Sequence, residues 1–301
     1  MVTLNCSIDK IKIEFEYVKL SFVTDFLRDL ESDYNYTDYY ESKKITNCKH
    51  NFKFGDGEGA VYLGIIPNWK KEERYDKNIV LEYNPNKVNA FKIPVLERLL
   101  NIPFILWRVM SFDIAVDLRL PYESVVMLKR DKREYIAKIG HSAVETVYLG
   151  RFGENGHIKL YNKAKEQKVD TDWTRFEITI KKINHLYATI DDFKKFCKLP
   201  TLYRKDVQLS ISYNNINDVQ RLALESIIDD IDRLYMIKRY DTRKKFEKML
   251  FECLDSIDLN VESCFNAFNT YVEYIKSMQD FENVELIEMS VFPVAGTKSF
   301  I

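Results

Sequence analysis

The sequence predicts an α+β protein with a largely antiparallel sheet flanked by helices and a helical region at the C-terminus. Two patterns predict this fold class. Up to about residue 213, apolar residues repeatedly alternate with polar ones, which is the period of a half-buried strand. From about residue 215, apolar residues recur every three or four positions, which is the period of an amphipathic helix. We therefore expect an α+β domain over residues 1–213 and a helical region over residues 214–301.

The first half of the α+β domain supplies strands, turns and two helices. A helix is expected from Thr24, which can cap its first turn, and the glycines between residues 55 and 59 are expected to form a turn. Asn84-Pro85-Asn86 is expected to end a strand and to precede a second helix over residues 88–100. The alternation predicts strands over residues 11–17, 60–66, 79–83 and 107–118.

The second half of the domain predicts a hairpin followed by another strand. Residues 146–150 alternate, a turn containing Gly153 and Gly156 follows, and a strand containing Tyr161 comes next. Residues 173–180 predict a further strand. In the C-terminal region, the helical period is carried by residues 222–235 and by residues 246–254.

Composition limits the class of protein. A chain of 301 residues with 46% hydrophobic and 30% charged residues is typical of an ordinary globular protein. No apolar run approaches the roughly 20 residues needed to cross a bilayer, and the N-terminus has no signal-peptide pattern. We therefore expect a cytoplasmic protein without a membrane partner. Residues 215–301 carry 10 Lys and Arg against 16 Asp and Glu, so the body before them is mildly basic, with 35 against 30.

Three predicted strands place charged and polar residues on one face. Side chains alternate across a strand, so Lys159, Tyr161 and Lys163 share a face while their apolar neighbours point into the core. Arg175 and Glu177 share a face of the next strand by the same rule. On the strand over residues 107–118, the shared polar positions are Asp113 and Asp117, with Ala115 between them.

This polar face has two interpretations. An open antiparallel sheet often exposes one polar face to water, and such a face needs no function. Against that reading, Ala115 is a small residue where an exposed strand face favours Thr, Lys or an aromatic residue. The functional interpretation is phosphodiester chemistry with Tyr161 as the nucleophile. The neighbouring lysines are expected to lower its pKa from about 10.

A divalent metal ion completes this chemical interpretation. A metal held by Asp113 and Glu177 is expected to withdraw charge from the scissile phosphate and to orient it for attack. Carboxylate oxygens favour Mg²⁺ or Mn²⁺ over zinc.

The sequence also resembles a known family. Residues 148–151 read Tyr-Leu-Gly-Arg, and residues 158–167 read Ile-Lys-Leu-Tyr-Asn-Lys-Ala-Lys-Glu-Gln. Residues 173–177 read Trp-Thr-Arg-Phe-Glu, and the upstream strand, residues 112–117, reads Phe-Asp-Ile-Ala-Val-Asp. In this order the segments are similar to the signature of Rep_trans-type replication initiators of rolling-circle plasmids and phages, which are related to conjugative relaxases. The resemblance covers about residues 108–181.

The resemblance implies an HUH-like fold and an enzyme that nicks DNA at a replication origin. Tyr161 would attack one strand, stay linked to the 5′-phosphate and free a 3′-hydroxyl primer. Lys159, Lys163 and Arg175 would neutralise phosphates. The metal, Mg²⁺ or Mn²⁺, would be held by Asp113 and Glu177, with Asp117 and Glu166 as further candidate ligands. Such relatives lack the His-hydrophobic-His metal motif, and no two histidines of this chain lie two residues apart.

Further expectations and alternatives stay open. The expected partners are double-stranded origin DNA with a single-stranded nick site, a host helicase and a second copy in a homodimer. The alternatives are a conjugative relaxase with the same chemistry, a non-catalytic nucleic-acid-binding protein and a hydrolytic metal nuclease. Two basic runs, at residues 129–133 and 238–245, either contact DNA phosphates or form a solvated surface.

Overall fold

The computed structural model describes residues 4–18, 25, 28, 40–41, 48–55, 57–67, 77–88, 94–102, 106–139, 144–181, 199–208 and 216–277. It divides into two compact units. Unit 1 comprises Met1–Ser7, Ile114–Thr179 and Thr189–Phe265, and unit 2 comprises Ile8–Asp113, Ile180–Ala188 and Asn266–Ile301. The division expected between residues 213 and 214 falls inside unit 1.

Unit 2 is built on strands in the order β2-β3-β4-β5-β1-β6, and the pairings from β2 through to β1 are antiparallel. The strands are β1 (Leu4–Val18), β2 (Tyr40–Glu41), β3 (Cys48–Phe54), β4 (Val61–Pro67), β5 (Lys77–Tyr83) and β6 (Trp107–Leu118). The first residues of β1 and the last residues of β6 belong to unit 1. As the alternation predicts, Ile11, Ile13 and Phe15 of β1 are buried.

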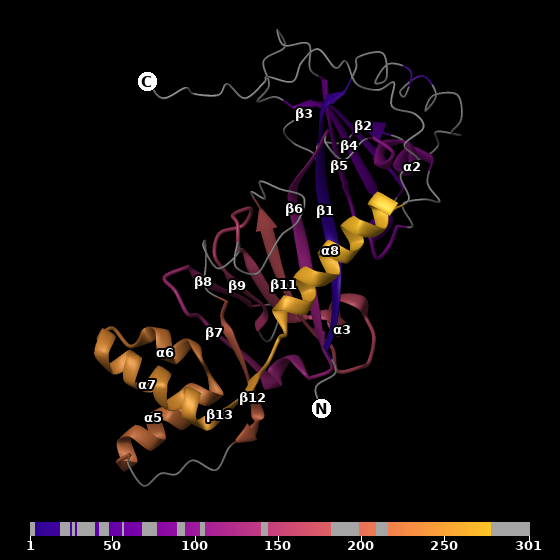
Figure 1. The fold of residues 1–301 in the computed structure, drawn as a ribbon. Coiled ribbons are helices and arrows are strands. Elements are labelled where there is room, and N and C mark those ends of the chain that lie inside the picture. The colour runs from indigo at the N-terminus through magenta and orange to yellow at the C-terminus, as the bar shows by residue number, and fades with distance from the viewer. Residues whose placement is uncertain are drawn as a thin grey trace, which may run out of the picture. The chain divides into compact units, whose positions relative to one another are not determined.

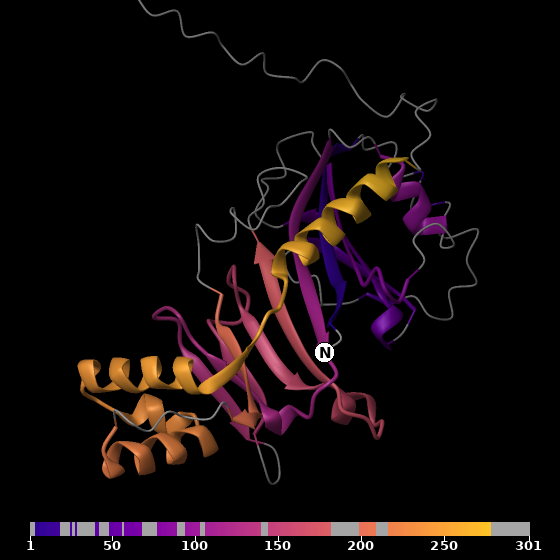
Figure 2. The ribbon, with the colours of Figure 1, turned by 60° about the horizontal axis from the view of Figure 1, so that its bottom comes forward.

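Helix α8 (Val261–Ser277) covers the sheet of unit 2 with its residues from Asn266 onward (Figures 1 and 2). The ring of Phe268 stacks on Phe112 of β6, with centroids 3.8 Å apart and planes 10° apart. The hydroxyl groups of Tyr271 and Tyr83 lie 2.5 Å apart. Both contacts bury aromatic side chains at the helix–sheet interface, where burial of large apolar surface stabilises the packing. The short helix α2 (Pro94–Leu100) also belongs to this unit.

Unit 1 contains the strands that carry the predicted polar face. Their order is β6-β11-β10-β9-β8, with β8 (Tyr135–Ile139), β9 (Val144–Leu149), β10 (Ile158–Asn162) and β11 (Thr174–Lys181). The pairings β8–β9, β9–β10 and β10–β11 are antiparallel, which confirms the predicted hairpin. Gly150, Gly153 and Gly156 all have positive φ in the turn between β9 and β10, a conformation that glycine adopts without strain.

A second sheet and three helices complete unit 1. The sheet has the order β13-β12-β7, with β7 (Val125–Leu128), β12 (Thr201–Gln208) and β13 (Leu254–Ile257). The helices are α5 (Asp218–Asp229), α6 (Asp232–Met236) and α7 (Tyr240–Cys253). Their apolar residues form one core with the sheet, which includes Leu128, Tyr203, Leu224, Leu234 and Leu250. Asn217 starts α5 with a capping box formed with Gln220.

The predicted α+β class, with a largely antiparallel sheet, flanking helices and helices toward the C-terminus, is confirmed. Some elements differ from expectation. Strands β2, β3, β7, β8 and β12 were not predicted, and β13 interrupts the region that was expected to be helical throughout. The helix expected from Thr24 lies almost wholly outside the described residues. Among the helices that the structure describes, none is long and apolar enough to cross a membrane.

Candidate active site

Strands β10 and β11 set the geometry of the site around Tyr161. Their antiparallel register places Tyr161 opposite Arg175 and Lys159 opposite Glu177. The apolar residues Ile158, Leu160, Phe176 and Ile178 are fully buried on the other face, as predicted. Because a strand that slips by one residue would turn these apolar side chains to the polar face, the core holds the register. The polar side chains are thereby held together on one face.

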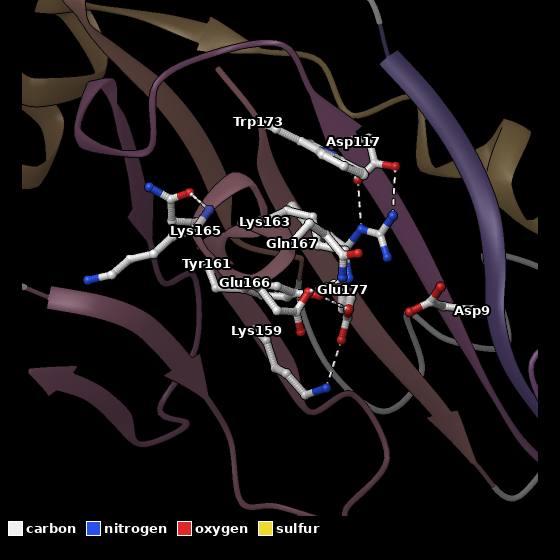
Figure 3. A network of polar contacts seen from close by, with 12 residues as sticks. Asp9, Asp117, Lys159, Tyr161, Lys163, Lys165, Glu166, Gln167, Trp173 and Glu177 are labelled. Atoms are coloured by element: carbon white, nitrogen blue, oxygen red, sulfur yellow. Dashed lines mark hydrogen bonds and ion pairs between the residues drawn. The ribbon is translucent and has the colours of Figure 1, made fainter. Parts of the chain in front are cut away.

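Glu177 joins the candidate nucleophile to a cation (Figure 3). The Tyr161 hydroxyl donates a hydrogen bond to Oε1 of Glu177 at 2.5 Å, and the Lys159 ammonium donates to Oε2 at 2.7 Å. The Glu177 side chain is only 8% exposed, whereas that of Lys159 is 30% exposed. A charge-assisted hydrogen bond of this length is among the stronger ones in proteins. One carboxylate therefore orients both the phenol and the lysine.

Arg175 and Asp117 form a second polar pair on the same face. The guanidinium donates from Nε to Oδ1 of Asp117 at 2.6 Å and from Nη2 to Oδ2 at 2.8 Å. The indole of Trp173 donates to the same Oδ1 at 2.7 Å. Both partners of the ion pair are nearly buried, so the bidentate geometry fixes the plane of the guanidinium. Asp117 therefore positions Arg175 next to Tyr161, its partner in the strand register.

A short helix, α3 (Lys163–Gln167), begins where β10 ends. The expectation that Lys163 shares a strand face with Lys159 and Tyr161 is therefore wrong, because the Asn162 cap ends the strand before it. The side chain of Asn162 accepts from the backbone N–H of Lys165 at 2.8 Å and caps the helix. The backbone N–H of Lys163 donates to the carbonyl of Trp173 at 2.9 Å. This bond joins the start of α3 to the residue just before β11. The buried Lys163 side chain forms an ion pair with Glu166, and its ammonium lies 5.8 Å from the centroid of the Tyr161 ring.

The expectation that neighbouring lysines lower the pKa of Tyr161 is wrong. Burial raises the pKa of the Tyr161 phenol well above its usual value, and the charge and hydrogen bond of Glu177 raise it further. Glu166 adds to this rise, while Arg175 opposes it. The physical reason is that Lys159 and Lys163 each pair with a carboxylate, which cancels much of their field at the phenol. Tyr161 therefore stays protonated at neutral pH.

The structure brings most of the predicted site residues together in unit 1. Lys159, Tyr161, Lys163, Arg175 and Glu177 lie around one another in unit 1, with Asp117 and Glu166 as ion-pair partners of two of the cations. Asp113 is the last residue of unit 2 in β6, and its charge acts there on Lys181. The predicted roles of all these residues stay predictions.

The carboxylates as arranged do not form a ready metal site. Both oxygens of Glu177 and both oxygens of Asp117 accept hydrogen bonds from neighbouring side chains, and Glu166 is held by Lys163. Within the described ranges, no three His, Cys, Asp or Glu side chains are grouped so that they could hold a metal ion. A carboxylate that binds Mg²⁺ or Mn²⁺ here would share its oxygens between the metal and these donors, or would exchange a partner.

The sequence indicated Trp173 only as part of a motif and gave it no role. Its indole bonds Asp117, and the Arg175 guanidinium lies 5.6 Å from the centroid of its ring. Asn162 likewise received no role, although an Asn immediately before a short charged segment is a common helix cap. Both residues organise the return from β10 to β11.

No family model and no curated protein matches the chain. Among solved structures, the chain is similar to the rolling circle replication initiator protein from Geobacillus stearothermophilus. The identity is 19%, 60% of this chain and 75% of that chain are covered, and the TM-score is 0.37. A similarity at this level defines no shared function, and the residues around Tyr161 carry the proposal that follows.

Proposed function

We propose that the protein initiates rolling-circle DNA replication by nicking one strand through Tyr161. The observation that carries the proposal is the hydrogen bond from the Tyr161 hydroxyl to Glu177, in a group that also contains Lys159 and Arg175. A nucleophile bonded to a base, with the base oriented by a third group, is the usual arrangement for covalent catalysis. The resemblance of residues 108–181 to Rep_trans-type initiators supports DNA as the substrate.

Glu177 is proposed as the general base. Because the pKa of Tyr161 is raised, the phenolate is too scarce at neutral pH to act as the nucleophile. The phenol becomes acidic only as its oxygen bonds to phosphorus, and Glu177 lies at 2.5 Å to accept the proton at that moment. Lys159, on the other oxygen of Glu177, holds the carboxylate in place.

The proposed step balances as a transesterification. The Tyr161 oxygen forms a bond to the phosphorus, and the bond between the phosphorus and the 3′-oxygen of the preceding nucleotide breaks. The phenolic proton passes to Glu177, and the leaving 3′-oxygen takes a proton from solvent water and becomes a free hydroxyl. The 5′-phosphate stays linked to Tyr161. Arg175, directly opposite Tyr161 in the ladder, is proposed to neutralise the charge that grows on the phosphoryl oxygens.

A divalent metal ion, Mg²⁺ or Mn²⁺, remains part of the proposal as an untested partner. It would supply further charge withdrawal from the phosphate, and Glu177, Asp117, Glu166 and Asp113 remain its proposed ligands. Because the described carboxylates are already engaged by cations or hydrogen-bond donors, no step above depends on it. Addition of a chelator to a nicking reaction, followed by each metal in turn, measures the dependence directly.

The test uses supercoiled plasmid that carries the gene for this chain and its flanking DNA, incubated with protein in the presence of Mg²⁺ or Mn²⁺. We expect relaxed circles with protein covalently bound at a 5′ end, resolved on a denaturing gel, and no such product with Tyr161→Phe. Nicking without a protein adduct would indicate a metal nuclease instead. Absence of both from DNA known to contain the origin would indicate a binding protein.

A replication assay tests the biological part of the proposal. A plasmid that depends on this gene is expected to be lost when the gene carries Tyr161→Phe. Maintenance of that plasmid alongside loss of its conjugative transfer would favour the relaxase alternative.

A further inference from the structure

A basic pocket lies in unit 1 on elements other than those that carry Tyr161. It has a volume of about 470 Å³ and lies between the segment after β7 and helix α7. Its lining residues are Lys129, Arg130, Leu199, Lys244, Glu247, Lys248 and Phe251. Four of these side chains are cations and one is a carboxylate, so the lining carries a net charge of +3.

The pocket unites two basic runs that are far apart in the sequence. Strand β12 lies between β7 and β13, with Thr201 opposite Leu128 and Leu202 opposite Ile257. Helix α7 packs on this sheet through a shared core that contains Leu128 of β7 and Leu250 of α7, and this packing brings α7 to the end of β7. Arg130 then bonds Thr201 from Nε at 2.7 Å. The gathering of these cations is therefore a product of the fold and does not follow from either run alone.

The cations are held in place by aromatic and polar contacts. The guanidinium of Arg130 lies 3.7 Å from the centroid of the Phe251 ring, and the ammonium of Lys129 lies 4.7 Å from the centroid of the Tyr235 ring. Cation–π contacts of this kind orient a cation while leaving its charge available to an anion. Lys244 and Lys248 lie one turn apart on the surface of α7. All four cations thus line the same pocket.

Positive charge is crowded in this pocket. Burial lowers the pKa of Lys129, and the nearby charge of Arg243 lowers it further, against the opposing effects of Asp131 and Glu247. Glu247 is shared, because Lys244 lies 2.5 Å and Arg243 lies 3.9 Å from its oxygens. Lys248 lies 3.9 Å from Glu252. Two carboxylates do not neutralise Lys129, Arg130, Arg243, Lys244 and Lys248 together, and a bound anion would relieve their mutual repulsion.

We propose that this pocket binds phosphate groups of the DNA backbone, at a place formed by different elements from those around Tyr161. The inference rests on the proposed function and adds a second contact for the same substrate. The aromatic ring in the lining, Phe251, is already in contact with the Arg130 guanidinium. Because this contact occupies the face of the ring, a contact with the DNA backbone is favoured over stacking of a base. Phosphate contacts fix the position of a protein on a duplex without reading its sequence.

The test measures binding of the full chain to a fluorescent DNA duplex over a range of salt concentrations. Each lost phosphate contact lowers the slope of log affinity against log salt by about 0.9. The variant K244Q/K248Q is expected to lower the slope by the amount that corresponds to about two lost phosphate contacts. It is also expected to weaken binding at least about tenfold at low salt. The control is R221Q/R233Q, which removes the same charge from α5 and α6, outside the lining, and is expected to change the slope less.

Two outcomes overturn the inference. One is an equal slope for K244Q/K248Q and R221Q/R233Q. The other is that K244Q/K248Q weakens binding of inorganic phosphate or of anionic lipid vesicles but leaves the affinity for the duplex unchanged. Failure of the proposed function is distinguishable, because it would remove the covalent adduct and leave the effect of K244Q/K248Q on duplex binding intact.

Discussion

The Tyr161 hydroxyl bonds Glu177 across the β10–β11 ladder although the two residues are diagonal neighbours, not direct partners. Tyr161 faces Arg175 and Glu177 faces Lys159, so each residue of the pair has a cation directly opposite. Diagonal positions on a sheet are within reach of a long aromatic side chain. The ladder therefore gives the phenol a proton acceptor in Glu177 and a cation in Arg175.

Replacement of the phenol tests its role as nucleophile. Tyr161→Phe removes the attacking oxygen and keeps the ring, so we expect loss of the covalent adduct with little change in DNA affinity. The matched control is Tyr148→Phe, because Tyr148 lies on the adjacent strand β9, directly opposite Lys159. Adduct formation on a denaturing gel should persist in that control. Equal loss in both variants would contradict a specific role for Tyr161.

Replacement of the proposed base tests how the phenol loses its proton. Glu177→Gln keeps the size of the side chain and cannot accept a proton, so we expect adduct formation to slow by about 10²–10⁴-fold. Because the pKa of Tyr161 is raised, the remaining rate should increase about tenfold per pH unit from about pH 7 to about pH 9, as the rare phenolate becomes more common. The wild-type rate should vary much less over that range.

The matched control for this measurement is Glu145→Gln. Glu145 lies on β9 and forms a partly exposed ion pair with Lys165, so its replacement should leave both the rate and its pH dependence unchanged. A Glu177→Gln variant with the wild-type pH profile would mean that another group accepts the proton.

The ion pair between Asp117 and Arg175 is expected to stabilise unit 1. Asp117→Asn leaves a nearly buried guanidinium without its counter-charge, at a cost of about 3–5 kcal/mol in the free energy of unfolding. Lys165→Gln breaks the more exposed pair with Glu145 and should cost at most about 1 kcal/mol. Urea denaturation compares the two variants. Similar losses would show that burial does not set the strength of these pairs.

The hydroxyl pair between Tyr83 and Tyr271 is expected to stabilise unit 2. Tyr83→Phe deprives the Tyr271 hydroxyl of this bond, at a cost of about 1–3 kcal/mol, and the variant Y83F/Y271F should recover part of the loss. Burial raises the pKa of Tyr271 to about 12. Since an unfolded tyrosine ionises near pH 10, the wild type should lose stability from about pH 10 upward. Additive losses in denaturation would contradict a direct bond between the two hydroxyls.

The strands of the site could be predicted from sequence because their apolar residues alternate without interruption. Strand β6 was expected over residues 107–118 and occupies Trp107–Leu118, and β10 and β11 were located equally directly. The short strand β13 escaped prediction because its four residues follow directly on α7. Strand β12 also escaped prediction, because it contains several polar residues. It forms a strand because it pairs with β7 on one side and β13 on the other.

The electrostatics of the site could not be predicted from the list of residues. Sequence placed lysines beside Tyr161 and suggested a lowered pKa. In the structure Lys159 pairs with Glu177 across the strands, Lys163 pairs with Glu166 within α3, and the phenol is buried. The basic pocket is a similar case. Lys129 and Lys244 belong to two runs that are far apart in the sequence, and packing of α7 on the β7-β12-β13 sheet brings them together.

The measurement that tests the central claim most directly is identification of the residue that carries the DNA. The covalent complex is digested with nuclease and then with trypsin, and the peptides are analysed by mass spectrometry. Cleavage after Lys159 and Lys163 isolates Tyr161 in the peptide over residues 160–163. We expect the mass of a nucleotide 5′-phosphate on that peptide. A nucleotide on any other tyrosine, or nicked DNA with no modified peptide, would contradict the proposal.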